Sequence, residues 1–411
     1  MRETDQMTSG RSIALVGGTL VDGTGREPIH DSVVVVCGTK IETSGRQNQV
    51  LLPADCSTVD VSGMTVMPGM FDCHVHISYT SYHLEDRLAT PRTLEVFQTA
   101  RMMQRTLRAG FTSIRVPGPN VDPGFRLAAE MGLIDAPRLI LAGRLAQIGG
   151  HFDSYHPSGV QLPFSGAEVC TGVAEAQAGA RRILRAGYDF IKICTTGDLQ
   201  DPLDHTQWTM EELRAIVYEA SARGKAVMAH AQGTQGIKNA IRAGVWSVEH
   251  GGRLDDEAIQ LFLDTGTYLV PTLFVVEDIQ KRGAEMGVPT TQIKYREFGH
   301  FHSESFQRAA RAGIKIAVGT DAIDEGAHGR NARELELMVR YGFTPMQAIV
   351  AATKTSSEVC RVNDKVGTLE PGKLADLLVV KGDPLGDIAI LQDQERLMIV
   401  MKEGRAFVNR L

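Results

Sequence analysis

The sequence has few cysteines and no block of like charge, and each absence argues against a class of protein. Its 411 residues include six cysteines, and no two of them stand in a CxxC spacing. This is too sparse for a disulfide scaffold and favours a reducing compartment. The formal net charge is −6 with no run of five or six like charges. We therefore expect a small-molecule substrate, and neither a nucleic-acid partner nor a membrane surface.

Long apolar stretches are also missing. No segment has the length of a membrane span. The first residues, Met1-Arg-Glu-Thr-Asp-Gln6, lack the apolar core of a signal peptide. We therefore expect a cytoplasmic protein.

The most informative segment present is His74-Val75-His76, which follows an apolar run from Met64 to Cys73. Side chains alternate between the two faces of a strand, so positions i and i+2 share a face. Two imidazoles placed in this way can bind one metal ion such as zinc. An HxH pair alone is weak evidence, because many proteins that contain one bind no metal.

Four more polar residues support the pair, because each ends a short apolar run of its own. Runs of this kind, rich in Val and Ile, are typical of parallel strands that are buried on both faces. Glycines that can end a helix precede several of the runs. A helix, a glycine, a strand and a polar residue thus recur along the chain, and the polar residues are Lys192, His230, His250 and Asp321.

This alternation predicts an α/β fold with a parallel sheet. Eight strands are expected, the number that closes a (β/α)8 TIM barrel, and such a barrel gathers residues at the carboxyl ends of its strands into one active site. An open doubly wound sheet is the alternative, but its crevice lies at one switch in strand order. The expected strands are 65–76, 111–116, 138–142, 189–194, 225–230, 246–250, 267–273 and 315–321.

The chain is longer than the roughly 250 residues of such a barrel. Both ends contain short apolar runs separated by turn residues, and we expect them to pair into one small β-sandwich. The expected division is 1–66 and 366–411 for this sandwich, with the barrel at 67–365. Helices are expected at 93–109, 166–186 and 209–223, the last with a capping box at Thr209-Met-Glu-Glu212, and within 277–311.

Taken in order, these residues resemble the metal-dependent amidohydrolase superfamily over nearly the whole chain. Further motifs resemble the branch that contains zinc-dependent Xaa-Pro dipeptidases, Xaa-Arg/Lys carboxypeptidases and ochratoxin-hydrolysing amidases. The motifs are Val66-Met-Pro-Gly-Met-Phe-Asp-Cys-His-Val-His76, Gly149-Gly-His151, Ala229-His-Ala231, Ser247-Val-Glu-His-Gly251, Gly319-Thr-Asp-Ala322 and His328-Gly-Arg-Asn-Ala-Arg-Glu-Leu335.

The resemblance implies two divalent metal ions, usually Zn²⁺. It implies His74, His76 and Asp321 as ligands of one ion, and His230 and His250 as ligands of the other. It also implies that Lys192 bridges both ions as a carbamate formed with carbon dioxide. Burial favours the neutral lysine amine that can add carbon dioxide. Related amidohydrolases are commonly oligomeric, so a homo-oligomer is expected.

The implied reaction is hydrolysis of a C–N amide-type bond by a hydroxide held between the two ions. Asp321 would act first as general base and then as general acid. The substrate stays open among peptides, N-acyl amino acids, aryl amides, carbamates and ureas. Gln232 stands where the peptide-cleaving relatives commonly carry an aromatic residue or histidine, which puts dipeptidase specificity in doubt.

Other candidate residues lie on loops and strand ends. His151 is a candidate for polarising a carbonyl or binding substrate, because it lies in a long glycine-rich connection over 143–165. His328 is either catalytic or an anchor for its own loop. Arg144 and Tyr155 are further substrate-binding candidates, with a surface role as the alternative. Cys194 is interpreted as a packed residue rather than a nucleophile, because no partner base is evident.

Two other functions remain open at this point. A metal-dependent deaminase would also attack a C–N bond, but the resembling deaminase sites use one metal and lack a bridging lysine, which Lys192 argues against. A non-catalytic scaffold of this superfamily would be expected to have lost metal ligands, whereas the six expected ligands are all present in this sequence.

Overall fold

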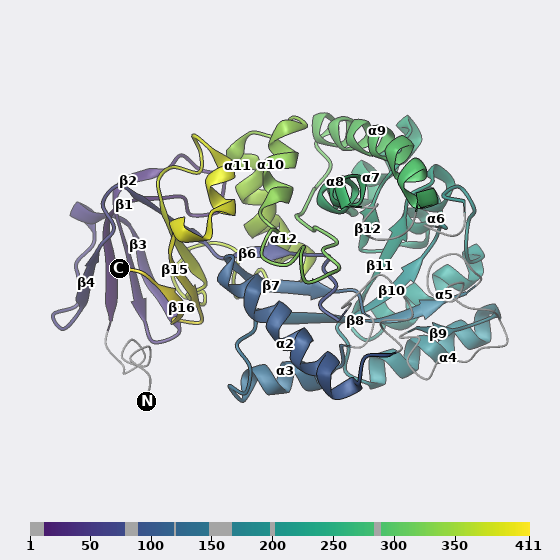
Figure 1. Ribbon diagram of the computed structural model, residues 1–411, viewed down its shortest axis with the longest axis horizontal. Helices are drawn as coiled ribbons and strands as arrows, with labels where there is room; N and C mark the ends of the chain where they lie inside the picture. The colour runs from purple at the N-terminus through teal and green to yellow at the C-terminus, as the bar shows by residue number, and fades with distance from the viewer. Residues whose placement is uncertain (1–11, 79–88, 119–120, 148–166, 198–201, 283–288) are drawn as a thin grey trace.

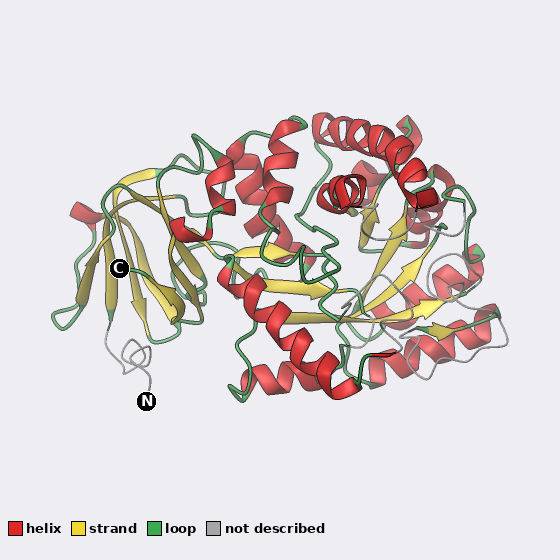
Figure 2. Cartoon of the chain, in the orientation of Figure 1, coloured by secondary structure: helices red, strands yellow, loops and turns green. Residues whose placement is uncertain are grey.

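The computed structural model describes residues 12–78, 89–118, 121–147, 167–197, 202–282 and 289–411. Two sheets organise this part of the chain (Figure 1). One sheet combines the two ends of the chain, and the other is a curled parallel sheet with helices packed around it. Figure 2 shows that helices lie on the outside of the parallel strands, as the alternation of elements predicts.

The terminal sheet joins strands from both ends of the chain, as expected. Among the described residues its eight strands form one hydrogen-bonded sheet in the order β16-β15-β14-β5-β1-β2-β3, with β4 paired to β1. Residues from both ends, among them Leu15, Val34, Leu377 and Ile399, share one apolar core. A separate β-sandwich is therefore not confirmed. The strands are β1 Ile13–Leu20, β2 Ile29–Cys37, β3 Lys40–Arg46, β4 Ser57–Asp60, β5 Met64–Pro68, β14 Leu377–Lys381, β15 Leu397–Lys402 and β16 Arg405–Asn409.

The second sheet is parallel throughout and follows the chain in order, β13-β12-β11-β10-β8-β7-β6, with β9 on β8. Its strands are β6 Met70–Asp72, β7 Phe111–Val116, β8 Arg138–Ala146, β9 Glu168–Val169, β10 Phe190–Cys194, β11 Ala226–Ala231, β12 Ser247–His250 and β13 Tyr268–Val270. Most expected strands are thus present with shifted ends. The fold is consistent with a TIM-like barrel.

The expected eighth strand is present only as two isolated parallel bridges, Leu269↔Ile316 and Val75↔Ala322. Its backbone still bonds to both edges of the sheet. The Ala317 N–H donates to the Leu269 carbonyl at 2.9 Å, and the Cys73 N–H donates to the Val318 carbonyl at 2.8 Å. Residues 315–322 therefore connect β13 with the segment after β6. An open sheet would leave these two edges apart.

The expected first strand, 65–76, was wrong as one element. Residues Met64–Pro68 form β5 and pair with β14 of the terminal sheet, whereas Met70–Asp72 form β6 and pair with β7. Gly69 lies between them, and a Cβ there would lie 2.2 Å from Thr112 Oγ1. Both halves are buried in apolar cores, so apolar character alone does not mark the change of partner. The expected domain boundary at 66/67 falls within β5.

Each segment expected to be helical contains a helix, with shifted ends. The capping box at Thr209 and Glu212 is confirmed, and it starts α5. Segment 277–311 divides into α8 and α9. Within the described residues, no helix is both long and apolar enough to cross a bilayer. The α-helices are α2 Arg92–Arg108, α3 Pro123–Glu130, α4 Gly172–Arg185, α5 Met210–Ser221, α6 Thr234–Ala243, α7 Asp256–Thr265, α8 Leu273–Arg282, α9 Pro289–Ala312, α10 Arg333–Arg340, α11 Pro345–Val350 and α12 Ser356–Val359, with a π-helical turn at Ala351–Thr355.

Candidate active site

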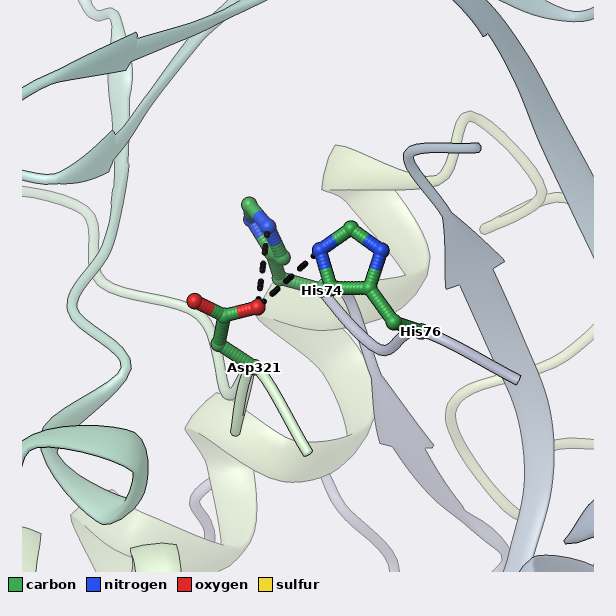
Figure 3. A group of neighbouring side chains, drawn as sticks. All are labelled: His74, His76 and Asp321. Atoms are coloured by element: carbon green, nitrogen blue, oxygen red, sulfur yellow. Dashed lines mark ion pairs between the residues drawn. The ribbon is translucent and has the colours of Figure 1, made fainter. Parts of the chain in front are cut away.

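His74, His76 and Asp321 converge at the carboxyl end of the parallel sheet (Figure 3). The Nε2 atom of His76 lies 3.1 Å from Asp321 Oδ1, and the Nε2 atom of His74 lies 3.6 Å from the same oxygen. One possible ligand atom from each residue lies within 4.8 Å of the others. These distances suit three ligands of one metal ion.

The two histidines follow β6 rather than lying inside it. Val75 between them is buried and bridges to Ala322, so the HxH segment keeps strand-like alternation. The Asp321 N–H donates to the His74 carbonyl at 2.6 Å, and the His76 N–H donates to the Ala322 carbonyl at 2.9 Å. Asp321 has a φ of 54°, in the left-handed region. The backbone thus fixes the Asp321 side chain opposite the two imidazoles.

His230 and His250 lie beside this group, at the ends of β11 and β12. Their ring centroids are 4.5 Å apart, and the His250 ring is 5.0 Å from the His74 ring. Lys192, in β10, is buried and lies close enough that its charge helps to lower the pKa of His74 and of His230. The structure therefore brings together all six residues that the sequence predicts as ligands.

The hydrogen bonds of His74 and His76 test whether a cation fits here. His74 Nδ1 lies 2.8 Å from Glu249 Oε2, and His76 Nδ1 lies 2.7 Å from the Gly118 carbonyl oxygen. Both partners only accept, so Nδ1 carries the proton and Nε2 keeps a lone pair. Both Nε2 atoms face Asp321 Oδ1, which has no hydrogen-bond donor among the described residues. Three lone pairs aimed at one point fit a divalent cation.

The electrostatics of the site agree with this fit. Burial lowers the pKa of His74 and of His230 well below the usual value, and it also lowers the pKa of His76. The imidazoles are therefore neutral at pH 7 and able to bind a metal. Burial likewise lowers the pKa of Lys192. A larger share of its amine is then neutral and able to react with carbon dioxide.

His230 and His250 are also oriented by hydrogen bonds. His230 Nε2 lies 3.2 Å from the Gly197 carbonyl oxygen. His250 Nδ1 lies 2.7 Å from Thr272 Oγ1. Both His250 and Thr272 have positive φ, at 73° and 53°. Residues in this sparsely populated region cluster at functional sites.

The other candidate residues differ in where they lie. Arg144 is buried in β8, in register with Lys192 of β10, so the two side chains lie on the same face of the sheet. Gln232 is buried just after β11, where its N–H donates to Thr196 Oγ1 at 3.0 Å. His151 and Tyr155 lie outside the described residues.

The contacts of His328 and Cys194 indicate structural roles. His328 Nδ1 lies 3.0 Å from Thr106 Oγ1 and its Nε2 lies 3.0 Å from the His76 carbonyl oxygen. Both ring nitrogens are engaged, and burial lowers the pKa of His328 to about 4. These contacts favour the loop-anchoring interpretation over a catalytic one. Cys194 is buried against Ala146, as expected of a packed residue.

Sequence reasoning missed the residues that support the histidines. Glu249 was part of a quoted motif but received no role. Arg115 lies in the middle of the apolar strand β7, and a charged residue in such a place is almost always paired. Asp72 was also missed. It accepts hydrogen bonds from the Thr320 hydroxyl at 2.5 Å and from the Asn331 amide at 2.8 Å, while burial raises its pKa to about 6.

Comparison with known proteins decides the family. Residues 65–407 match the amidohydrolase family, which is most of the chain. The chain belongs to the amidohydrolase family. This amidohydrolase is therefore a hydrolytic enzyme that acts on C–N bonds, and the resemblance seen in its motifs is confirmed.

Named relatives span almost the whole of this amidohydrolase. It is 30% identical to an ochratoxinase from Aspergillus niger over 96% of this chain and 86% of that protein. The crystal structure of A. niger ochratoxinase superimposes with a TM-score of 0.88 at 28% identity, covering 98% of this chain and 96% of that one. A prolidase complexed with N-methylphosphonate-L-proline superimposes with a TM-score of 0.90 at 32% identity, covering 97% and 100%.

Proposed function

We propose that this amidohydrolase is a two-metal hydrolase that cleaves a C–N amide-type bond. One observation carries the proposal: the Nε2 atoms of His74 and His76 lie 3.6 and 3.1 Å from Asp321 Oδ1, while the Nδ1 atoms of both rings face other acceptors. We assign one divalent ion, Zn²⁺ by preference for nitrogen ligands, to these three residues. His230 and His250 would hold a second ion, and Lys192 would contribute to the centre as a carbamate.

The proposed chemistry divides between the metals and the chain. Bound divalent ions supply Lewis acidity, which makes a water nucleophilic near neutral pH and polarises the substrate carbonyl. Asp321 takes the proton of the attacking water on its carboxylate and then gives it to the leaving nitrogen. Its side chain is 13% exposed, so it borders the space that a substrate can enter. His74, His76 and His230 are neutral and serve as ligands, so the proton of the water passes to Asp321 and not to these rings.

The substrate class is proposed from the relatives. The names ochratoxinase and prolidase support a peptide or N-acyl amino acid, with aryl amides, carbamates and ureas as further candidates. Gln232 is buried at the end of β11, where an amide offers both a donor and an acceptor to a substrate. Arg144, His151 and Tyr155 are proposed as further substrate-binding residues.

We further propose a cytoplasmic homo-oligomer that acts on a small molecule and has neither a nucleic-acid nor a membrane partner. Light scattering coupled to size exclusion tests the oligomer: a mass of one chain of 44.7 kDa would contradict it.

The function is tested by metal analysis together with a substrate panel. The purified protein is stripped, reloaded with zinc, and assayed against dipeptides, N-acyl amino acids, aryl carbamates and phenylureas. We expect two ions per chain and zinc-dependent release of an amine from one set. A His76→Ala variant serves as a control and is expected to lose one ion and the activity.

The same experiment separates the other two functions. Release of ammonia from aminated heterocycles, with one ion per chain, would favour a deaminase. A protein that folds and assembles identically without metal, and hydrolyses none of the panel, would favour a scaffold. Lys192 argues against the deaminase, because its burial beside His74 and His230 suits a bridge between two ions.

A further inference from the structure

A buried arginine lies beneath the candidate metal site. Arg115, in β7, is fully buried. Its Nε donates to the Cys73 carbonyl oxygen at 2.7 Å, its Nη1 to Ser247 Oγ at 3.0 Å, and its Nη2 to Glu249 Oε1 at 2.8 Å. Phe190 covers one side of the guanidinium, with the ring centroid 5.2 Å from Cζ. Arg115 thus contacts the backbone just before His74 and two residues of β12.

Glu249 continues this chain of contacts to the site. Its Oε1 accepts from Arg115 and from the Ser247 hydroxyl at 2.6 Å, while its Oε2 accepts the Nδ1–H of His74 at 2.8 Å. The next residue, His250, also lies against His74, with ring centroids 5.0 Å apart. Consecutive strand residues normally point to opposite faces. The positive φ of His250 is the turn that lets both reach the same histidine.

Stability alone does not explain the Arg115–Glu249 pair. Both side chains are completely buried, and the cost of desolvating two charges commonly offsets their attraction. Apolar residues of similar size would fill the same space without that cost. Apolar residues cannot accept a hydrogen bond from His74 Nδ1–H, and this hydrogen bond decides the tautomer and the direction of the ring.

We propose that Arg115 and Glu249 are positioning residues for the metal site. They hold His74 so that its Nε2 is unprotonated and faces the position of the ion that His76 and Asp321 would share. This inference rests on the proposed function. Arg115 holds the backbone beside His74 through its hydrogen bond to the Cys73 carbonyl. It also holds the Glu249 carboxylate in place, and this carboxylate orients the His74 ring. The pair acts on the His74 side of the centre, and no described contact links it to the ring nitrogens of His230.

The chemistry of glutamine makes Glu249→Gln a sharp test. A glutamine amide has one oxygen, whereas the two oxygens of Glu249 accept from His74, Arg115 and Ser247. If the amide oxygen faces His74, the NH₂ group meets the donors of Arg115. If it faces Arg115, the NH₂ group meets His74 Nδ1, and the imidazole must then take the other tautomer. Either way the orientation of His74 loosens, although size is conserved.

The experiment measures metal affinity, not only activity. The stripped wild-type and Glu249→Gln proteins are titrated with Zn²⁺ by calorimetry, and loaded with Co²⁺ for absorption spectroscopy. We expect one of two ions to bind about 10- to 100-fold more weakly in Glu249→Gln, in line with the loss of such supporting contacts. We expect the other ion to bind as in the wild type and the Co²⁺ bands of the affected ion to shift.

A matched control is available at the opposite end of the barrel. Asp376 is buried and accepts from Arg138 Nη1 at 2.6 Å, so it forms a part-buried arginine–carboxylate pair at the start of β8. Asp376→Asn should lower stability without changing either metal affinity. If Glu249→Gln prevents folding, the double variant Arg115→Met/Glu249→Gln removes both charges together and decides the question with the same titration.

The outcomes separate the two levels of inference. Two ions bound with wild-type affinity and spectrum in a folded Glu249→Gln or double variant would overturn the positioning role and leave the proposed function intact. Equal weakening by Asp376→Asn would also overturn it, because the effect would then follow general destabilisation. A wild-type protein that binds no metal would overturn the proposed function, and the positioning role with it.

Discussion

Replacing Asp321 with asparagine should abolish catalysis and spare the fold. Asp321 has a φ of 54°, and asparagine is among the few residues other than glycine that adopt this region readily. The amide has the same shape and keeps one oxygen facing His74 and His76, so a metal ligand remains. What it loses is the ability to take a proton at neutral pH.

The expected loss follows from that role. General acid–base catalysis contributes about 10²- to 10⁴-fold, so kcat for Asp321→Asn should fall by that factor, or about 3–5 kcal/mol in activation free energy, with a smaller change in KM. Steady-state kinetics and metal analysis on the same sample check this. Asp321→Ala is the comparison: it also lacks the base, and it loses the metal-facing oxygen as well. Near-normal turnover by a fully metallated Asp321→Asn would refute the assigned role.

Three further outcomes are expected. Gly143→Ala places a Cβ 2.6 Å from Ile183 Cγ2, so urea unfolding should show a loss of about 1–3 kcal/mol from overpacking, and an unchanged midpoint would contradict the tight contact. Glu277 has its pKa lowered to about 2, first by hydrogen bonding to Arg333. Its stabilisation is therefore complete above pH 4.5, the usual value, and is lost as the pH falls toward 2. Glu277→Gln should flatten the acid side of a stability–pH curve by roughly 2 kcal/mol, and curves of the same slope would argue against the pairing. Removing metal with a chelator should abolish activity and lower the melting temperature, and about 100 Kd of added zinc should restore roughly 2.7 kcal/mol of stability; a melting temperature insensitive to the chelator would weigh against a bound metal.

The sequence was informative wherever a polar residue ended an apolar run. Lys192, His230 and His250 could be placed in this way, because a parallel sheet aligns the ends of its strands whatever the distance along the chain. Asp321 could also be placed, although its segment forms only isolated bridges instead of a full strand. The positions of these side chains depend on topology, and topology follows from the repeating pattern.

Contacts between strands were not predictable in the same way. Nothing in the local pattern pairs Arg115 with Glu249, since their contact depends on the register of strands that are not neighbours in the sheet. The break at Gly69 was missed because both sides of it are equally apolar. The sandwich expected for the terminal strands is not confirmed, and the sequence could not decide it, because alternating strands form either one sheet or two packed sheets.

The junction at Gly69 has a consequence for how the enzyme matures. The Thr65 hydroxyl donates to the carbonyl of Gly382, 317 residues further along the chain. On the ribosome, β5 can pair with β1 early, but it lacks β14 until translation is almost finished. The two histidines lie only a few residues beyond β5, and Asp321, which faces them, also lies far along the chain, so this group is completed late in synthesis. Loss of the last strands would then affect this group through β5, which pairs with β14.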